Sequence, residues 1–60
     1  MGLDPLVETL QDPNPEVVRI SIETLALVGD RHHAEPIRPF LRHPDLEVRE
    51  AAELAVELLE

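Results

Sequence analysis

Three histidines, His32, His33 and His43, are the side chains of this 60-residue chain best suited to bind a transition metal. The chain has no cysteine, which excludes disulfides and thiolate metal sites. Adjacent histidines do not share a helix face, and no further His stands at a spacing that completes a tetrahedral set. No Ser-His-Asp arrangement and no glycine-rich phosphate loop is visible either. We therefore expect solvated loop histidines, with adventitious metal binding as the alternative, and no catalytic centre, metal or cofactor.

A second group of charged side chains recurs at helical spacing near the end of the sequence and would form an acidic stripe on one helix face. A basic protein or peptide could dock there through charge complementarity. The alternative is a solvated helix face that keeps the protein soluble. The stripe consists of Glu50, Glu53, Glu57 and Glu60.

Composition narrows the classes of partner. The formal net charge is −8, whereas nucleic-acid binding needs a basic face, so we expect no nucleic acid. Phe40 is the single aromatic residue, so platforms for stacking bases or sugars are missing. No stretch approaches the roughly 18 apolar residues of a membrane span, and no secretory leader pattern is present. We expect a cytoplasmic protein that does not bind membranes.

Proline, glycine and Asx residues divide the chain into helical segments. Asn14-Pro15 is a helix-start signal, Gly29 is a helix-stop signal, and Asp45 is a helix cap. Interior prolines shorten the third segment, which we expect to begin near Pro36 after a turn around His32-His33. The pattern predicts four helices, over residues 6–11, 15–28, about 36–42 and 46 to nearly 60.

Two stretches of the chain are alike: DPNPEVVR at residues 12–19 and HPDLEVR at residues 43–49. Pro5 and Pro13 match Pro36 and Pro44 at an offset of 31, while Val18-Arg19 matches Val48-Arg49 at an offset of 30. One extra residue near Val17 or Val18 explains the slip and predicts a first turn one residue longer than the second. The chain is therefore predicted to be a single domain, residues 1–60, with two repeats at about 3–29 and 30–60, a period typical of helical solenoids.

The repeat resembles the HEAT repeat in its short form named after phycobilisome lyases. The resemblance is carried by DPNPEVVRISIETLALVGD (residues 12–30) and HPDLEVREAAELAVELL (residues 43–59). It implies an all-α fold of two stacked antiparallel helical hairpins and a protein-binding surface, without fixing one activity. It also implies an acid ahead of Val-Arg that pairs with an arginine between repeats; this acid is present as Asp12 but replaced by His43 in the second copy.

Two functional alternatives stand beside a non-catalytic interaction or scaffold module. The chain could be a structural fragment, natural or designed, of a longer solenoid. It could also be a small metal-dependent enzyme, since it resembles deoxyhypusine hydroxylase. That resemblance implies a His-Glu metal pair just after Val-Arg, but these places hold Ile20-Ser21 and Glu50-Ala51.

Helical periodicity predicts the core and leaves apolar residues over. The helix over residues 15–28 is apolar on several sides, which predicts burial on several sides. The expected core is Leu6, Leu10, Val18, Ile22, Leu25, Val28, Ile37, Phe40, Leu41, Val48, Ala52, Ala55 and Leu59.

The apolar residues outside that core predict self-association. Leu54 and Leu58, with Ala51, leave an apolar strip on the last helix, and Leu3 with Val7 leaves another near the start. About three repeats are usually needed for stability. We therefore expect a homodimer with Ala51, Leu54 and Leu58 at its interface, or a place in a longer repeat array.

Overall fold

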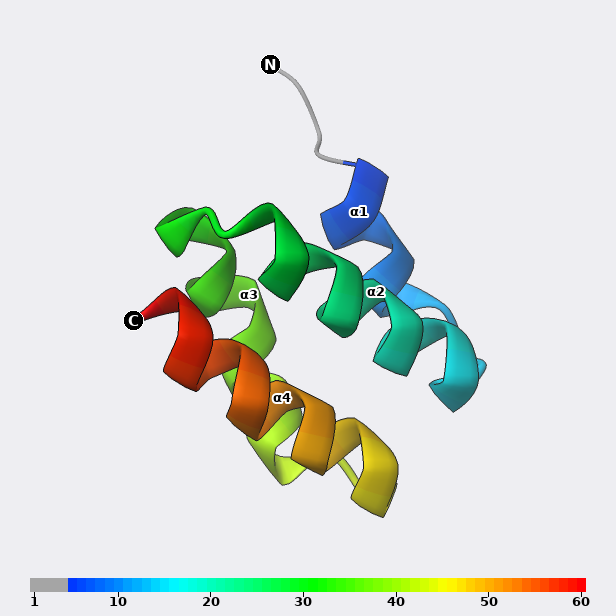
Figure 1. Ribbon diagram of the computed structural model, residues 1–60. Coiled ribbons are helices and arrows are strands. Elements are labelled where there is room, and N and C mark those ends of the chain that lie inside the picture. The colour runs from blue at the N-terminus through cyan, green and yellow to red at the C-terminus, as the bar shows by residue number, and fades with distance from the viewer. Residues whose placement is uncertain (1–4) are drawn as a thin grey trace.

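Helices form all the regular secondary structure of residues 5–60, the part of the chain that the computed structural model describes. Two long α-helices have the predicted bounds, and the shorter segments each combine one α-helical turn with 3-10 turns (Figure 1). The four predicted helices are thus two regular helices and two composite ones. The elements are α1 (Pro5–Glu8), η1 (Thr9–Gln11), α2 (Pro15–Val28), η2 (Arg31–His33), α3 (Ala34–Ile37), η3 (Arg38–Arg42) and α4 (Leu46–Leu59).

The ends of the long helices follow from local chemistry. Asn14 caps α2 by accepting the Glu16 N–H, and Asp45 caps α4 by accepting the N–H groups of Glu47 and Val48. These bonds satisfy amide donors that have no partner inside a helix. Gly29 ends α2 in the left-handed conformation at φ 77°, which costs glycine no steric strain. The predicted caps and stop signal are confirmed.

The third helical segment begins earlier than predicted. The expected turn around His32-His33 is the 3-10 helix η2, and α3 begins at Ala34 rather than near Pro36. Pro36 fits because the first turn of a helix needs no N–H donor there. Pro39 then removes a donor from the α-helical ladder, and the segment continues as 3-10 helix through Arg42.

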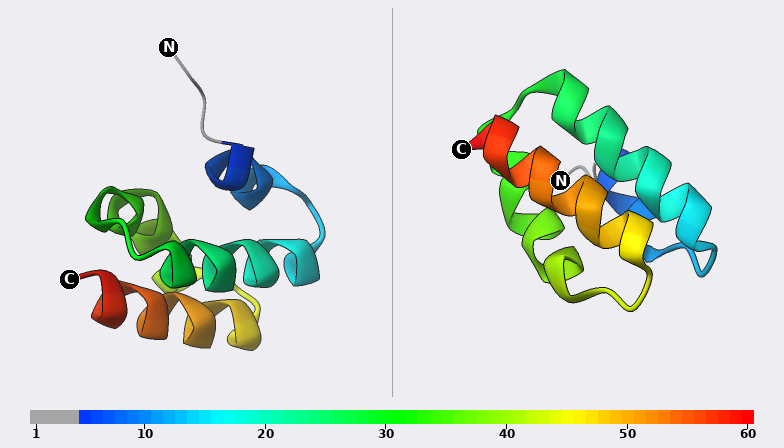
Figure 2. Two further views of the ribbon diagram at one scale, coloured as in Figure 1. Left: turned by 45° about the horizontal axis from the view of Figure 1, so that its top comes forward. Right: turned by 60° about the horizontal axis from the view of Figure 1, so that its bottom comes forward.

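The two long helices lie side by side and run in the same direction, and the right-hand view of Figure 2 shows the short segments behind them. α2 packs against α1 and η1, whereas α4 packs against α3 and η3, so each long helix forms a hairpin with the segment that precedes it. The predicted fold class, two stacked antiparallel helical hairpins, is confirmed. The expected longer first turn is wrong: both connections have three residues, 12–14 and 43–45, so the extra residue lies in the first turn of α2.

One apolar core joins the two hairpins, and it contains most of the predicted residues. Ala34 was missed, because the third helix was expected to start after it. Phe40 and Leu41 are only partly buried against the core, and so is Val7, which therefore adds little to an exposed strip. The buried apolar residues are Leu10, Val18, Ile22, Leu25, Ala34, Ile37, Val48, Ala52, Ala55 and Leu59.

One expectation about burial is wrong, one holds only in part, and a third concerns side chains that the structure does not describe. Val28 is 57% exposed, because α2 ends there and the chain turns away at Gly29. α2 packs against both hairpins, but it is not buried on all of its apolar sides, since Ile20 and Leu27 face solvent as well. The side chains of Leu3 and Leu6 lie outside the described residues.

Candidate protein-binding surface

The neighbouring faces of α2 and α4 form an apolar groove of about 250 Å³. Ala26 and Ala51 are partly buried along it, and small side chains at these positions let the two helices approach each other closely. Three leucines also line the groove, and their side chains are largely exposed to solvent. Their exposed fractions are 87% for Leu27, 63% for Leu54 and 73% for Leu58.

A more polar depression continues this groove toward the first turns of the two helices. It shares Glu23, Ala51 and Leu54 with the apolar groove and adds Arg19, Glu47 and Glu50 to its lining. The two depressions therefore make one trough that is acidic at one end and apolar at the other.

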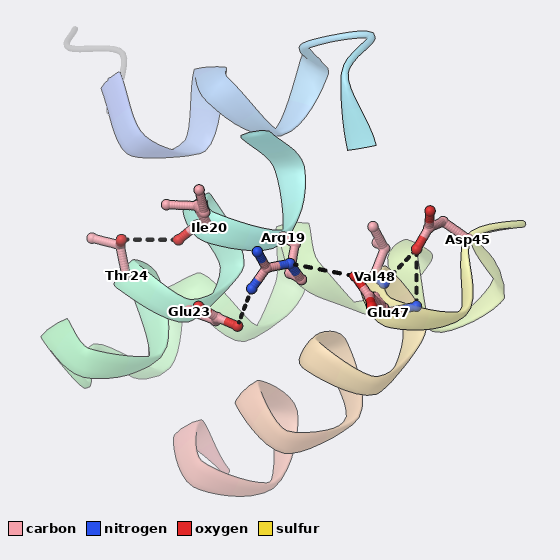
Figure 3. Close-up of polar contacts among 7 residues, drawn as sticks. All are labelled: Arg19, Ile20, Glu23, Thr24, Asp45, Glu47 and Val48. Carbon is pink, nitrogen blue, oxygen red and sulfur yellow. Dashed lines mark hydrogen bonds and ion pairs between the residues drawn. The ribbon is translucent and has the colours of Figure 1, made fainter. Parts of the chain in front are cut away.

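Arg19 links the two helices at the acidic end (Figure 3). Its guanidinium lies 3.0 Å from the Glu23 carboxylate and its Nε lies 3.9 Å from the Glu47 carboxylate. The lining at this end holds the carboxylates of Glu23, Glu47 and Glu50 but only one guanidinium, so the end of the trough keeps a negative excess. Such half-exposed pairs contribute little to stability but orient the charges.

The predicted acidic stripe divides in the folded protein. Glu50 lines the trough. Glu53 and Glu57 are exposed on the same helix but line neither part of the trough. Glu60 forms an ion pair with Arg38, which also lies 3.8 Å from Glu35. A docking role for the whole stripe stays a prediction.

The predicted dimer residues, Ala51, Leu54 and Leu58, all line the groove. They lie on the side of α4 that faces α2, so the apolar surface is shared between the repeats. Sequence reasoning missed the contributions of α2, namely Glu23, Ala26 and Leu27. Glu23 and Leu27 stand four residues apart and share a helix face, but only the packing of α2 beside α4 brings them to this groove.

His32 and His43 serve local structure, and His33 is partly buried in η2. His32 donates its backbone N–H and lies with its ring Nδ1 2.9 Å from the Asp30 carboxylate. These hydrogen bonds lower the pKa of the Asp30 carboxyl below its ordinary value, and the bond from the His32 backbone has the largest effect. His43 accepts the Asp45 N–H on Nδ1 at 3.0 Å, and its ring stacks on Phe40. Within residues 5–60, no group of three or more His, Asp or Glu side chains is placed to hold a metal ion.

Two positions that the resemblance to the hydroxylase implied as metal ligands hold Ser21 and Ala51 here. Ser21 is buried, donates to the Val17 carbonyl at 2.9 Å and is hydrogen-bonded to the Thr9 hydroxyl. Its partner position across the repeat is the partly buried Ala51.

The expected arginine pairing also takes a different form. Asp12 accepts the Asn14 N–H, and the ion pair between repeats joins Arg19 to Glu47. Arg49 donates to the carbonyls of His43 and Pro44 and so closes its own turn. The second turn therefore keeps its form although His43 replaces the acid, and Arg49 donates to backbone carbonyls of the turn instead of pairing with a carboxylate.

Two hairpins packed with their second helices side by side define a helical-repeat protein of the α-solenoid type. The family model for HEAT repeats matches residues 3–59, and the chain belongs to the HEAT repeat family. The phycobilisome-lyase form of the repeat stays a prediction. Comparisons with curated proteins and with solved structures found no match. No helix among the described residues is both long enough and apolar enough to cross a membrane.

Proposed function

We propose that the protein is a non-catalytic interaction module that binds another protein through the trough between α2 and α4. The observation that carries this proposal is the exposure of Leu27, Leu54 and Leu58 along one groove built by both repeats. Water contact with three neighbouring leucines is unfavourable, and exposed apolar patches of this kind mark contact sites. A polar rim around an apolar centre is the usual anatomy of a protein interface.

The same face suits binding for a structural reason. The two long helices are continuous, and their backbone amides bond within the helices, so side chains alone present the groove to a partner. HEAT repeats are typically non-catalytic, which agrees with this role.

A second candidate is a segment of a longer HEAT solenoid without a separate role. Ile20 and Val28 favour it, because they are 49% and 57% exposed and line neither part of the trough. A neighbouring repeat packed on α2 would cover apolar side chains of this kind.

The proposal is tested by protein capture with matched surface variants. Three immobilised proteins are compared for the partner protein that each captures: the wild type, the Leu54→Ser/Leu58→Ser double variant and Ile20→Ser. The last variant removes an exposed apolar side chain outside the trough. We expect the double variant to lose the captured protein and Ile20→Ser to retain it, while circular dichroism shows equal helix content for all three. Equal capture by the double variant would contradict the role of the groove, and loss only in Ile20→Ser would favour the solenoid-segment candidate.

A further inference from the structure

We propose that the occupant of the trough is one amphipathic helix of another protein, apolar along one stripe and basic at one end. This inference rests on the proposed function and deepens it by naming the chemistry of the partner. It is drawn from the backbone chemistry of the walls, the length of the trough and the order of charge along it.

The walls of the trough offer no backbone hydrogen bonds to a partner. α2 and α4 are continuous helices, so their amides and carbonyls are used internally along the groove. An extended peptide laid on such a surface would leave its own backbone groups unpaired as it loses water. A helix satisfies these groups within itself, and its side-chain ridges fit between those of the two wall helices.

The length of the trough fits about three turns of helix. Its lining on α4 runs from Glu47 to Leu58, and at a rise of about 1.5 Å per residue this span is roughly 16 Å. A partner helix of about 11 residues covers the same distance and brings apolar side chains at positions i, i+3 or i+4, and i+7 to one face.

Charge is ordered along this length. Glu47 and Glu50 belong to the first half of α4, and Glu23 of α2 lies beside them in the lining. Leu58 of α4 and Leu27 of α2 belong to the last turns, where the lining is apolar. Arg19 balances only part of the acidic end, because it pairs with two of the three carboxylates in this lining. Lys or Arg side chains at one end of the partner complement the remaining charge.

A second copy of this chain fits the trough less well. If two copies meet with their long helices parallel, the acidic ends face each other and like charges repel. If they meet antiparallel, the acidic end of one copy covers the leucines of the other, and carboxylates lose water without a partner. The homodimer expected from the sequence is therefore an alternative outcome of the test.

The test uses three labelled synthetic peptides of about 14 residues, the length of each wall helix, and the full chain. The first has leucines at helical spacing and lysines in one end turn. The second replaces the lysines by glutamates, and the third has the composition of the first with its leucines out of helical register. We expect the first to bind at least about tenfold tighter than the others by fluorescence anisotropy at low salt, with a smaller difference at high salt, since salt screens exposed charges.

Two charge reversals on α4 locate the contact. Glu50→Lys, in the trough, should lower the affinity for the lysine peptide by about tenfold. Glu57→Lys, exposed on the same helix but outside the trough, should change this affinity by less than about twofold. Equal binding of the lysine and glutamate peptides, or equal effects of the two reversals, would overturn the inference.

The remaining outcomes separate this inference from the proposed function. If a captured protein is lost in Leu54→Ser/Leu58→Ser but is not displaced by the lysine peptide, the groove binds protein and the proposed chemistry of the partner is wrong. If sedimentation equilibrium shows a dimer that Leu58→Glu separates and the lysine peptide does not, the occupant is a second copy and the inference is likewise overturned.

Discussion

The two hairpins use the same backbone turn built from different side chains. In the first, the Asp12 carboxylate accepts the Asn14 N–H at 2.8 Å, and Asn14 caps the following helix. In the second, the His43 ring accepts the Asp45 N–H at 3.0 Å, and Asp45 caps the following helix. Both turns place an acceptor two residues before the cap, a carboxylate oxygen in the first and an imidazole nitrogen in the second. The difference teaches that the turn constrains an acceptor position rather than a residue type.

The interiors of the two hairpins differ more than their turns. Ile22 and Leu25 of α2 are matched at an offset of 30 by Ala52 and Ala55 of α4, and all four are buried. The first repeat thus buries large side chains at the positions where the second buries small ones. Because one shared core joins the repeats, each position is adapted to its neighbours rather than to its repeat equivalent.

The largest effect should come from removing a large side chain from the first repeat. Leu25→Ala leaves a cavity in a fully buried site and should lower the free energy of unfolding by about 2–5 kcal/mol. Leu27→Ala, two residues along the same helix and 87% exposed, should change it by less than about 0.5 kcal/mol. Urea denaturation measures both, and similar losses would mean that Leu27 is covered in solution.

The reverse exchange tests the second repeat. Ala55→Leu introduces the side chain that the first repeat carries at this position into a site that is 1% exposed. Overpacking should destabilise the protein by about 1–3 kcal/mol. Glu53→Leu adds a leucine at an exposed position of the same helix and is the control. An unchanged urea midpoint for Ala55→Leu would show that the two repeats can exchange core residues.

The helix caps should rank next. Asp45→Ala removes an acceptor for two N–H groups and should cost about 1 kcal/mol, seen as a lower melting temperature. Asn14→Ala removes an acceptor for one N–H group and should cost somewhat less. If neither variant melts earlier, these caps do not hold the helix starts.

Substitutions of His43 test the equivalence of the turns directly. His43→Ala leaves the Asp45 N–H without its acceptor and should cost about 0.5–1.5 kcal/mol. His43→Asp supplies the carboxylate that Asp12 provides in the first turn and should recover most of that loss, apart from the contact with Phe40. Thermal melts of the two variants decide the point: equal destabilisation would show that the histidine ring itself is required.

The smallest effect should be a pH dependence of stability that comes from Asp30, in the segment connecting the two repeats. The hydrogen bonds from His32 lower the pKa of Asp30, so the folded state binds this proton more weakly than the unfolded state. Their contribution to stability is present above the unfolded pKa of about 3.9 and is lost as the pH falls through the folded pKa. An NMR titration of the Asp30 carboxyl should give a midpoint below about 3.9, and Asp30→Asn should reduce the loss of stability on acidification.

Much of the fold was predictable because its signals are local. Asn14-Pro15 and Asp45 set the starts of the two long helices, and Gly29 sets the end of α2, through bonds within a few residues. The repeat in the sequence indicated the stacked hairpins. The third segment was less predictable, because two prolines left several helix starts possible and packing of Ala34 in the core selected one.

The sequence by itself determined the helices, their caps, the repeat and most of the core, because periodicity and capping act over one or two turns. Only the tertiary structure decided which apolar residues remain in solvent and which acids gather beside them. α2 and α4 pack side by side, and this brings Leu27 to Leu58 and Glu23 to Glu50 from segments about 30 residues apart. The periodicity of a single helix cannot predict these pairs, because they depend on how α4 packs against α2.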